Sequence, residues 1–218
     1  MPKPHASRLR HARALVLVLV VAVLAGCTAA NASAGGSSLP PEPVGPRTVT
    51  VVGDSLTVLG DQPIRAALTG SDWWAALDAF PGRTTGTQMD AIRAAAHRDN
   101  DATVIELGTN DALAIARGEL SIVEADADIV AALDLFPDRC VVWVIPDRDP
   151  ERHGAATGTE IDAVVRREAA HRANLHVADL SALLSSHPEY LVPDRVHFTV
   201  DGYEALGRLM ATALEACT

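Results

Sequence analysis

The stretch Thr-Val-Thr-Val-Val-Gly-Asp-Ser-Leu, residues 48–56, places a serine directly after a run of β-branched residues. Such a run predicts a buried strand, and catalytic side chains in sheet proteins gather outside the carboxyl ends of strands. Residues 57–68 have a helical pattern, and backbone N–H groups at the start of a helix favour developing negative charge. By itself, however, this position of Ser55 favours a turn and a helix N-cap over a nucleophile.

The same strand-then-helix pattern repeats along the chain. Short apolar, β-branched runs predict strands at 48–52, 75–80, 103–107, 140–145 and 174–178. Stretches of helical period predict helices at 57–68, 87–98, 122–136, 159–172 and 201–216. Alternation of this kind is typical of a parallel sheet with helices on both faces. We therefore expect a three-layer α/β/α sandwich around a flavodoxin-like, five-stranded parallel sheet.

The first 26 residues have the pattern of an export signal. Four basic residues precede an apolar run over 14–25, which is too short to span a membrane. The run ends in Leu-Ala-Gly-Cys, residues 24–27, which resembles the lipobox of bacterial lipoproteins. The resemblance implies that Cys27 is lipidated and anchors the protein on the outer face of the cell membrane. An ordinary cleaved signal peptide with an incidental cysteine is the alternative, and it also predicts export.

The remaining chain divides into a linker and one domain. Residues 27–46 are mostly small residues and prolines, which cannot supply a core. The stretch 47–218 has the length of a single domain. Removal of the signal takes four of the 18 basic residues and none of the 28 acidic ones, which leaves a net charge of −14. A body this acidic argues against a nucleic-acid or anionic-lipid partner.

Two cysteines of the domain are expected to approach each other. Cys140 begins the predicted fourth strand, and Cys217 ends a helix that runs back toward the same edge of the sheet. Outside the cytoplasm such a pair can oxidise. Closing a loop of about 77 residues would stabilise the fold by roughly 4 kcal/mol. The alternative is one buried thiol and one thiol at a frayed helix end.

Conspicuous residues follow four of the predicted strands, at 53–56, 81–85, 108–111 and 194–197. Because the strands of a parallel sheet point the same way, these four segments should meet at one edge. A serine hydroxyl becomes a nucleophile when a base accepts its proton, and His197 can be that base for Ser55. Asp194 can hold the other imidazole nitrogen. The sequence therefore predicts a triad of Ser55, His197 and Asp194.

Acyl transfer also needs hydrogen-bond donors for the oxyanion. The candidates are the backbone N–H groups of Ser55 and Gly82 and the side-chain amide of Asn110. A glycine suits the second position because it has no Cβ to obstruct a ligand, and Gly86 is an alternative in the same loop. Each donor could contribute about 3 kcal/mol of transition-state stabilisation.

The four segments together resemble the SGNH hydrolases, also called GDSL esterases and lipases, from the first strand to the last helix. In that resemblance Ser55 matches the first-block nucleophile, Gly82 and Asn110 match the oxyanion donors of the second and third blocks, and Asp194 and His197 match the last block. Asp111, next to Asn110, is expected to brace the loop. The chain lacks the Gly-x-Ser-x-Gly of α/β-hydrolases.

Other chemically conspicuous residues have simpler interpretations. His187 with Asp194 and His197 could be drawn as a metal site, but the spacing matches no familiar ligand pattern, so neither a metal nor a cofactor is expected. Trp73 and Trp74 are interpreted as core or rim packing, with a sugar-stacking platform as the alternative.

The sequence thus predicts an exported, lipid-anchored serine esterase that hydrolyses short-chain or acetyl esters, on a polysaccharide or a lipid. Two other functions remain open. The same site could transfer an acyl group to a carbohydrate hydroxyl, or the chain could be a binding or scaffolding lipoprotein with an idle site.

Overall fold

The computed structural model describes residues 45–148 and 157–217, which belong to one compact unit. The predicted signal segment, Cys27 and nearly all of the linker lie outside the described residues. Within the described part, no helix is long and apolar enough to cross a membrane.

A five-stranded, wholly parallel sheet forms the centre of this unit, with the strand order β2-β1-β3-β4-β5. The strands are β1 (Arg47–Gly53), β2 (Trp73–Ala79), β3 (Ala102–Glu106), β4 (Cys140–Ile145) and β5 (Leu175–Asp179). The predicted fold class is therefore confirmed. β4 has the predicted bounds, and the bounds of the other four strands differ from the predicted ones by one or two residues.

Two apolar cores lie on the two faces of the sheet. Successive side chains of a strand point to opposite faces, so Val51 of β1 packs in one core and Val52 in the other. In β4 the same alternation separates Val142 from Trp143. Helices cover both faces of the sheet, so the side chains on either face of a strand are buried. This explains why the strands are continuously apolar.

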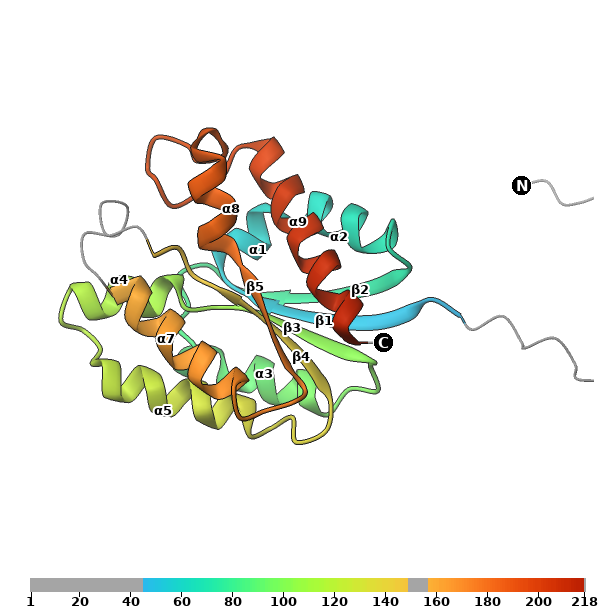
Figure 1. Ribbon diagram of the computed structural model, residues 1–218, viewed down its shortest axis with the longest axis horizontal. Coiled ribbons are helices and arrows are strands. Elements are labelled where there is room, and N and C mark those ends of the chain that lie inside the picture. The colour runs from blue at the N-terminus through green and yellow to red at the C-terminus, as the bar shows by residue number, and fades with distance from the viewer. Residues whose placement is uncertain (1–44, 149–156, 218) are drawn as a thin grey trace, which may run out of the picture. The chain divides into compact units, whose positions relative to one another are not determined.

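The helices divide between the two faces of the sheet, as Figure 1 shows. One face carries α1 (Ser55–Leu59), α2 (Asp61–Thr69), α8 (Leu180–Ser186) and α9 (Val200–Leu214). The other carries α3 (Met89–Ala96), α4 (Thr109–Ala116), α5 (Ile122–Leu133) and α7 (Thr157–Ala169). Short 3₁₀ turns lie at η1 (Gly86–Gln88), η2 (Pro188–Tyr190) and η3 (Glu215–Cys217).

The prediction of one helix over 57–68 is wrong, because the chain forms α1 and α2 with a break at Gly60. A Cβ at this position would lie only 2.8 Å from the ring of Tyr203 and 2.9 Å from the Leu56 carbonyl. The absence of a Cβ at Gly60 therefore lets α9 approach the α1–α2 corner closely. Because of the break, Ser55 lies in a helix of little more than one turn.

Two helices were not predicted, α4 and α8. The first begins inside the polar segment 108–111, and the second is only seven residues long and rich in serine. The other four helices have bounds within three residues of those predicted.

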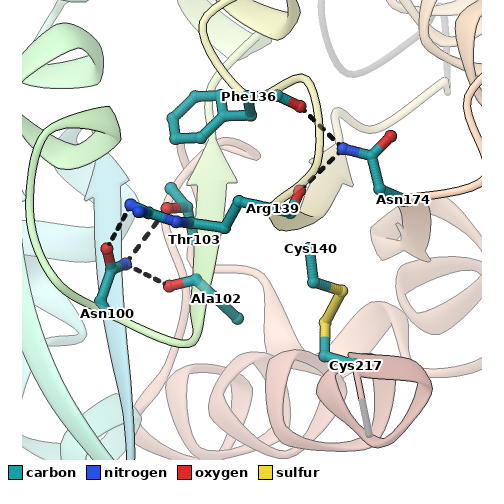
Figure 2. The surroundings of a disulfide bond; sticks show 8 residues. All are labelled: Asn100, Ala102, Thr103, Phe136, Arg139, Cys140, Asn174 and Cys217. Carbon is teal, nitrogen blue, oxygen red and sulfur yellow. Dashed lines mark hydrogen bonds between the residues drawn. A yellow bond between two sulfur atoms is a disulfide. The ribbon is translucent and has the colours of Figure 1, made fainter.

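A disulfide joins Cys140, at the amino end of β4, to Cys217 at the end of η3, with the two Cα atoms 5.6 Å apart (Figure 2). Nearby, the Asn174 side chain donates to the carbonyls of Phe136 and Arg139, both at 2.7 Å. The Arg139 guanidinium in turn donates to Asn100. The two cysteines that the sequence placed near each other are thus covalently joined.

Candidate active site

Ser55, His197 and Asp194 come together at the carboxyl edge of the sheet. The Ser55 Oγ lies 3.0 Å from Nε2 of His197, and the His197 Nδ1 lies 2.8 Å from Oδ2 of Asp194. A carboxylate at Nδ1 holds the hydrogen on that nitrogen, which leaves Nε2 to accept from the serine hydroxyl. This arrangement can activate a serine nucleophile.

The Asp194–His197 turn is shaped by its own backbone. Arg195 has a positive φ of 61°, which is uncommon for a residue with a side chain. The tight turn allows Oδ1 of Asp194 to accept from the N–H groups of Val196 and His197, both at 2.9 Å. Because Oδ1 is held by these two N–H groups, Oδ2 of Asp194 is directed at the histidine ring.

The charge of Asp194 is stabilised by the same contacts. The backbone N–H of His197, its ring and the N–H of Val196 lower the pKa of Asp194 to about 2. The carboxyl group is 52% exposed, so hydrogen bonding rather than burial controls its protonation. Asp194 therefore remains ionised throughout the pH range in which a histidine base works.

Ser55 is the first residue of α1, and the preceding Asp54 is the N-cap of that helix. The Asp54 Oδ1 accepts from the N–H of Leu56 at 2.9 Å. As Asp54 rather than Ser55 performs the capping, the serine hydroxyl remains available to His197. Ser55 can be both a helix-start residue and a nucleophile.

Asn110 is oriented by the same aspartate. Its Nδ2 donates to Oδ2 of Asp54 at 2.6 Å, which identifies the nitrogen end of the amide as the one facing Asp54. An amide nitrogen carries two hydrogens, so a second N–H is left for an oxyanion. Burial raises the pKa of Asp54 to about 6, partly offset by its hydrogen bonds.

The structure separates the two glycine candidates for the second donor. Gly82 has a φ of +74° and open space where a Cβ would point. Gly86 begins η1, and a Cβ there would overlap the Asp128 carboxylate. Gly82 is therefore the candidate with open surroundings. Its loop is held by Asp111, which accepts from the N–H of Thr85 at 3.0 Å, in agreement with the bracing role expected for Asp111.

Three buried residues behind Ser55 were missed by the sequence analysis. Gln88 donates its side-chain N–H to the carbonyl of Gly53 at 2.8 Å. Thr57 donates its hydroxyl to the Glu106 carboxyl at 2.9 Å. A signal for Glu106 existed in the sequence, since a carboxyl group at the end of an apolar strand needs a buried partner.

The remaining candidates lie away from this constellation. His187 stacks on Tyr190 and pairs with Glu189 at 3.0 Å. Trp73 is buried beneath Arg47, as the packing interpretation requires, but Trp74 is 71% exposed and is not part of the core. Among the described residues, the group with metal-ligand side chains is Cys140, His176 and Cys217, and the two sulfurs are bonded to each other.

Comparison with known protein families identifies the class of protein. Residues 51–205, from β1 into α9, match the GDSL-like lipase/acylhydrolase family. The matched segment includes Ser55, Asn110, Asp194 and His197. The chain therefore belongs to this family and is an enzyme that acts on acyl esters. No curated protein sequence matches it significantly.

Solved structures of the same fold include enzymes of several specificities. TesA is 19% identical with a TM-score of 0.66, over 79% of this chain and all of that one. The catalytic domain of a peptidoglycan O-acetyltransferase from Streptococcus pneumoniae is 22% identical with a TM-score of 0.64, over 78% and 94%. An acetylxylan esterase from Geobacillus stearothermophilus is 15% identical with a TM-score of 0.64, over 78% and 94%. At these identities the likeness shows a shared fold.

Proposed function

We propose that this protein is an exported, lipid-anchored serine esterase that hydrolyses short acyl esters. The observation that carries the proposal is the chain of contacts from Ser55 Oγ through His197 to Asp194, at 3.0 and 2.8 Å. Each contact has hydrogen-bond length, as a serine hydrolase requires.

The reaction follows from these contacts. Ser55 attacks the ester carbonyl while His197 accepts its proton at Nε2, and Asp194 stabilises the imidazolium that forms. The N–H groups of Ser55 and Gly82 and the Asn110 amide stabilise the oxyanion. His197 then protonates the leaving alcohol. Finally, water deprotonated by His197 attacks the acyl-enzyme and releases the acid.

The cavity next to the site is small, which is in keeping with a short acyl group. Apolar side chains such as Leu56 and Phe198 line it together with Thr109, Asp147 and Arg195, and its volume is about 10 Å³. A space of that size holds about one water molecule. We therefore expect acetyl and other short esters to react faster than long-chain esters. A series of p-nitrophenyl esters of increasing acyl length tests this, and a preference for long chains would contradict it.

Transfer of the acyl group to a carbohydrate hydroxyl is the second candidate. It is favoured by the structural likeness to a peptidoglycan O-acetyltransferase, and polysaccharide esters are accordingly candidate substrates. A transferase must direct the acyl-enzyme to a sugar hydroxyl rather than to water. If added oligosaccharide lowers the release of free acid while acylated sugar accumulates, transfer is the function. If free acid is unaffected, hydrolysis is.

The site itself is tested by a fluorophosphonate probe. We expect the wild type to be labelled, and Ser55→Ala to lose labelling and several orders of magnitude in turnover. Ser186→Ala is the matched control, because the Ser186 hydroxyl only donates to a carbonyl of its own helix at 3.1 Å. A wild type that neither reacts with the probe nor cleaves short esters would contradict the esterase proposal.

The anchor is proposed from the sequence alone, from the basic start, the apolar run and the Leu-Ala-Gly-Cys ending at Cys27. Two or more acyl chains would hold the protein stably on the outer face of the membrane. In a bacterial host, Cys27→Ala should move the protein from the membrane fraction to the soluble or unprocessed fraction. Unchanged membrane association without lipid incorporation would contradict the anchor.

A further inference from the structure

Glu106 occupies a buried place directly behind the nucleophile. It ends β3 and pairs in register with Gly53 of β1, two residues before Ser55. Its residue exposure is only 2%, and the Thr57 hydroxyl donates to its Oε2 at 2.9 Å. A Cβ on Gly53 would overlap the Thr57 side chain and lie 3.2 Å from that oxygen. The glycine thus makes room for the Glu106–Thr57 contact.

The carboxyl groups of Glu106 and Asp54 form a pair. Asp54 is fully buried and directly follows Gly53, the register partner of Glu106, and the charge of Asp54 acts on the Glu106 carboxyl to raise its pKa. Two adjacent carboxyl groups in a buried site cannot both be ionised, so one of them keeps a proton at neutral pH. When the two carboxyl groups share one proton, they form a hydrogen bond instead of repelling each other as two negative charges.

The surrounding donors indicate which carboxyl keeps the proton. Asp54 accepts from the N–H of Leu56 through one oxygen and from Asn110 through the other, and these contacts favour its ionised form. Burial and the charge of Asp54 raise the pKa of Glu106 well above its usual range. The Tyr203 phenol of α9 and the His197 ring also interact electrostatically with this pair.

We propose that Glu106 is a positioning residue: as a protonated acid it donates a hydrogen bond to Asp54 and so holds Asp54 where it orients the Asn110 amide toward the oxyanion. The chain of contacts runs from Thr57 through Glu106 and Asp54 to Asn110. Glu106 touches no reacting atom. This inference rests on the proposed function, because it assigns Asn110 the role of an oxyanion donor.

Two substitutions separate this role from a structural one. Glu106→Gln retains a donor for Asp54 and an acceptor for Thr57, whereas Glu106→Leu removes both. We expect the leucine variant to lose about 10- to 100-fold in kcat with little change in KM, less than the loss of a whole oxyanion donor. The glutamine variant should remain within a few-fold of wild type. Thr103→Val, a buried polar-to-apolar change on the same strand, is the control and should leave kcat unchanged.

A double-mutant cycle tests whether Glu106 acts through the amide. If it does, Glu106→Leu should cost little further kcat in an Asn110→Ala background, because the oriented group is already gone. Multiplicative losses would overturn the proposal. So would a leucine variant with wild-type kcat, or a folded glutamine variant as slow as the leucine one.

Infrared spectroscopy tests the proton without any substrate. At about pH 8, where Asp54 is ionised, the wild type should show a protonated-carboxyl C=O band that is missing from Glu106→Gln. An absent band in the wild type would overturn the inference even if the enzyme is active. Conversely, a wild type that shows the band but cleaves no ester contradicts the esterase proposal and leaves the protonated pair standing.

Discussion

The helix ends at the two edges of the sheet satisfy their unpaired backbone groups in opposite ways. At the carboxyl edge the helices begin, and their exposed N–H groups are met by acceptors such as Asp54, Asp179 and Thr199. At the amino edge the helices end, and their exposed carbonyls are met by donors: Arg139 donates to the carbonyls of Ala95 and Ala96 at the end of α3. Helix termini leave such groups unpaired in any fold.

This difference explains where the chemistry lies. Capping N–H groups calls for acceptors, and where the acceptor is a carboxylate it can also orient a histidine or an amide. Asp194 and Asp54 do both, since each binds backbone N–H groups and a functional side chain. At the amino edge the donors Arg139 and Asn174 only close the loops, and a disulfide joins the chain covalently. One edge is therefore built for reaction and the other for stability.

The largest expected effect is on activity at the carboxyl edge. Asp194→Asn should keep the fold but lower kcat by about 10³- to 10⁴-fold, because an amide no longer holds the His197 tautomer or stabilises its charge. Steady-state kinetics with a short-chain ester measures the loss, and circular dichroism checks the fold. A loss of less than tenfold would mean that His197 works without Asp194.

Next comes the disulfide at the amino edge. The double variant Cys140→Ser/Cys217→Ser should lose about 4 kcal/mol of stability, or about 10 °C in Tm, because the unfolded chain is no longer restricted by a loop of 77 residues. Its kcat near room temperature should match the wild type. A comparable fall in kcat would show that the two edges are coupled.

A third effect is the pH dependence of stability that buried carboxyl groups impose. Burial raises the pKa of Asp111 to about 6 from a usual 3.8. The folded state thus binds this proton more tightly than the unfolded state, so stability falls as pH rises from about 4 to about 6, by up to about 3 kcal/mol. Asp111→Asn should reduce that slope in urea titrations, with Asp54 still contributing to it, whereas Asp90→Asn, on an exposed side chain, should leave it intact. An unchanged slope in Asp111→Asn would mean that this carboxyl does not titrate there.

The smallest effect is expected for Asn174→Ala. It leaves the part-buried carbonyls of Phe136 and Arg139 without their donor, which should cost about 1 to 2 kcal/mol. Chemical denaturation measures this, and kcat should remain that of the wild type. A larger loss of activity than of stability would contradict the separation of the two edges.

The sequence predicted the strands well because burial on both faces makes them continuously apolar, as in β4. It failed at helix boundaries for reasons outside the local pattern. The glycine at the break, Gly60, leaves room for Tyr203, more than 140 residues later in the chain. α4 begins inside the segment that carries Asn110, where polar residues obscure a helical pattern.

By itself the sequence determined which residues could meet, since strand ends in a parallel sheet share an edge and Ser55, Gly82, Asn110, Asp194 and His197 each follow a predicted strand. Only the tertiary structure decided how they meet. It brought the Ser55 hydroxyl to 3.0 Å from His197, gave Gly82 rather than Gly86 the open position, and set Glu106 against Asp54. The physical reason is that periodicity records the burial of a side chain, whereas hydrogen-bond distance and shared protons depend on neighbours from other elements.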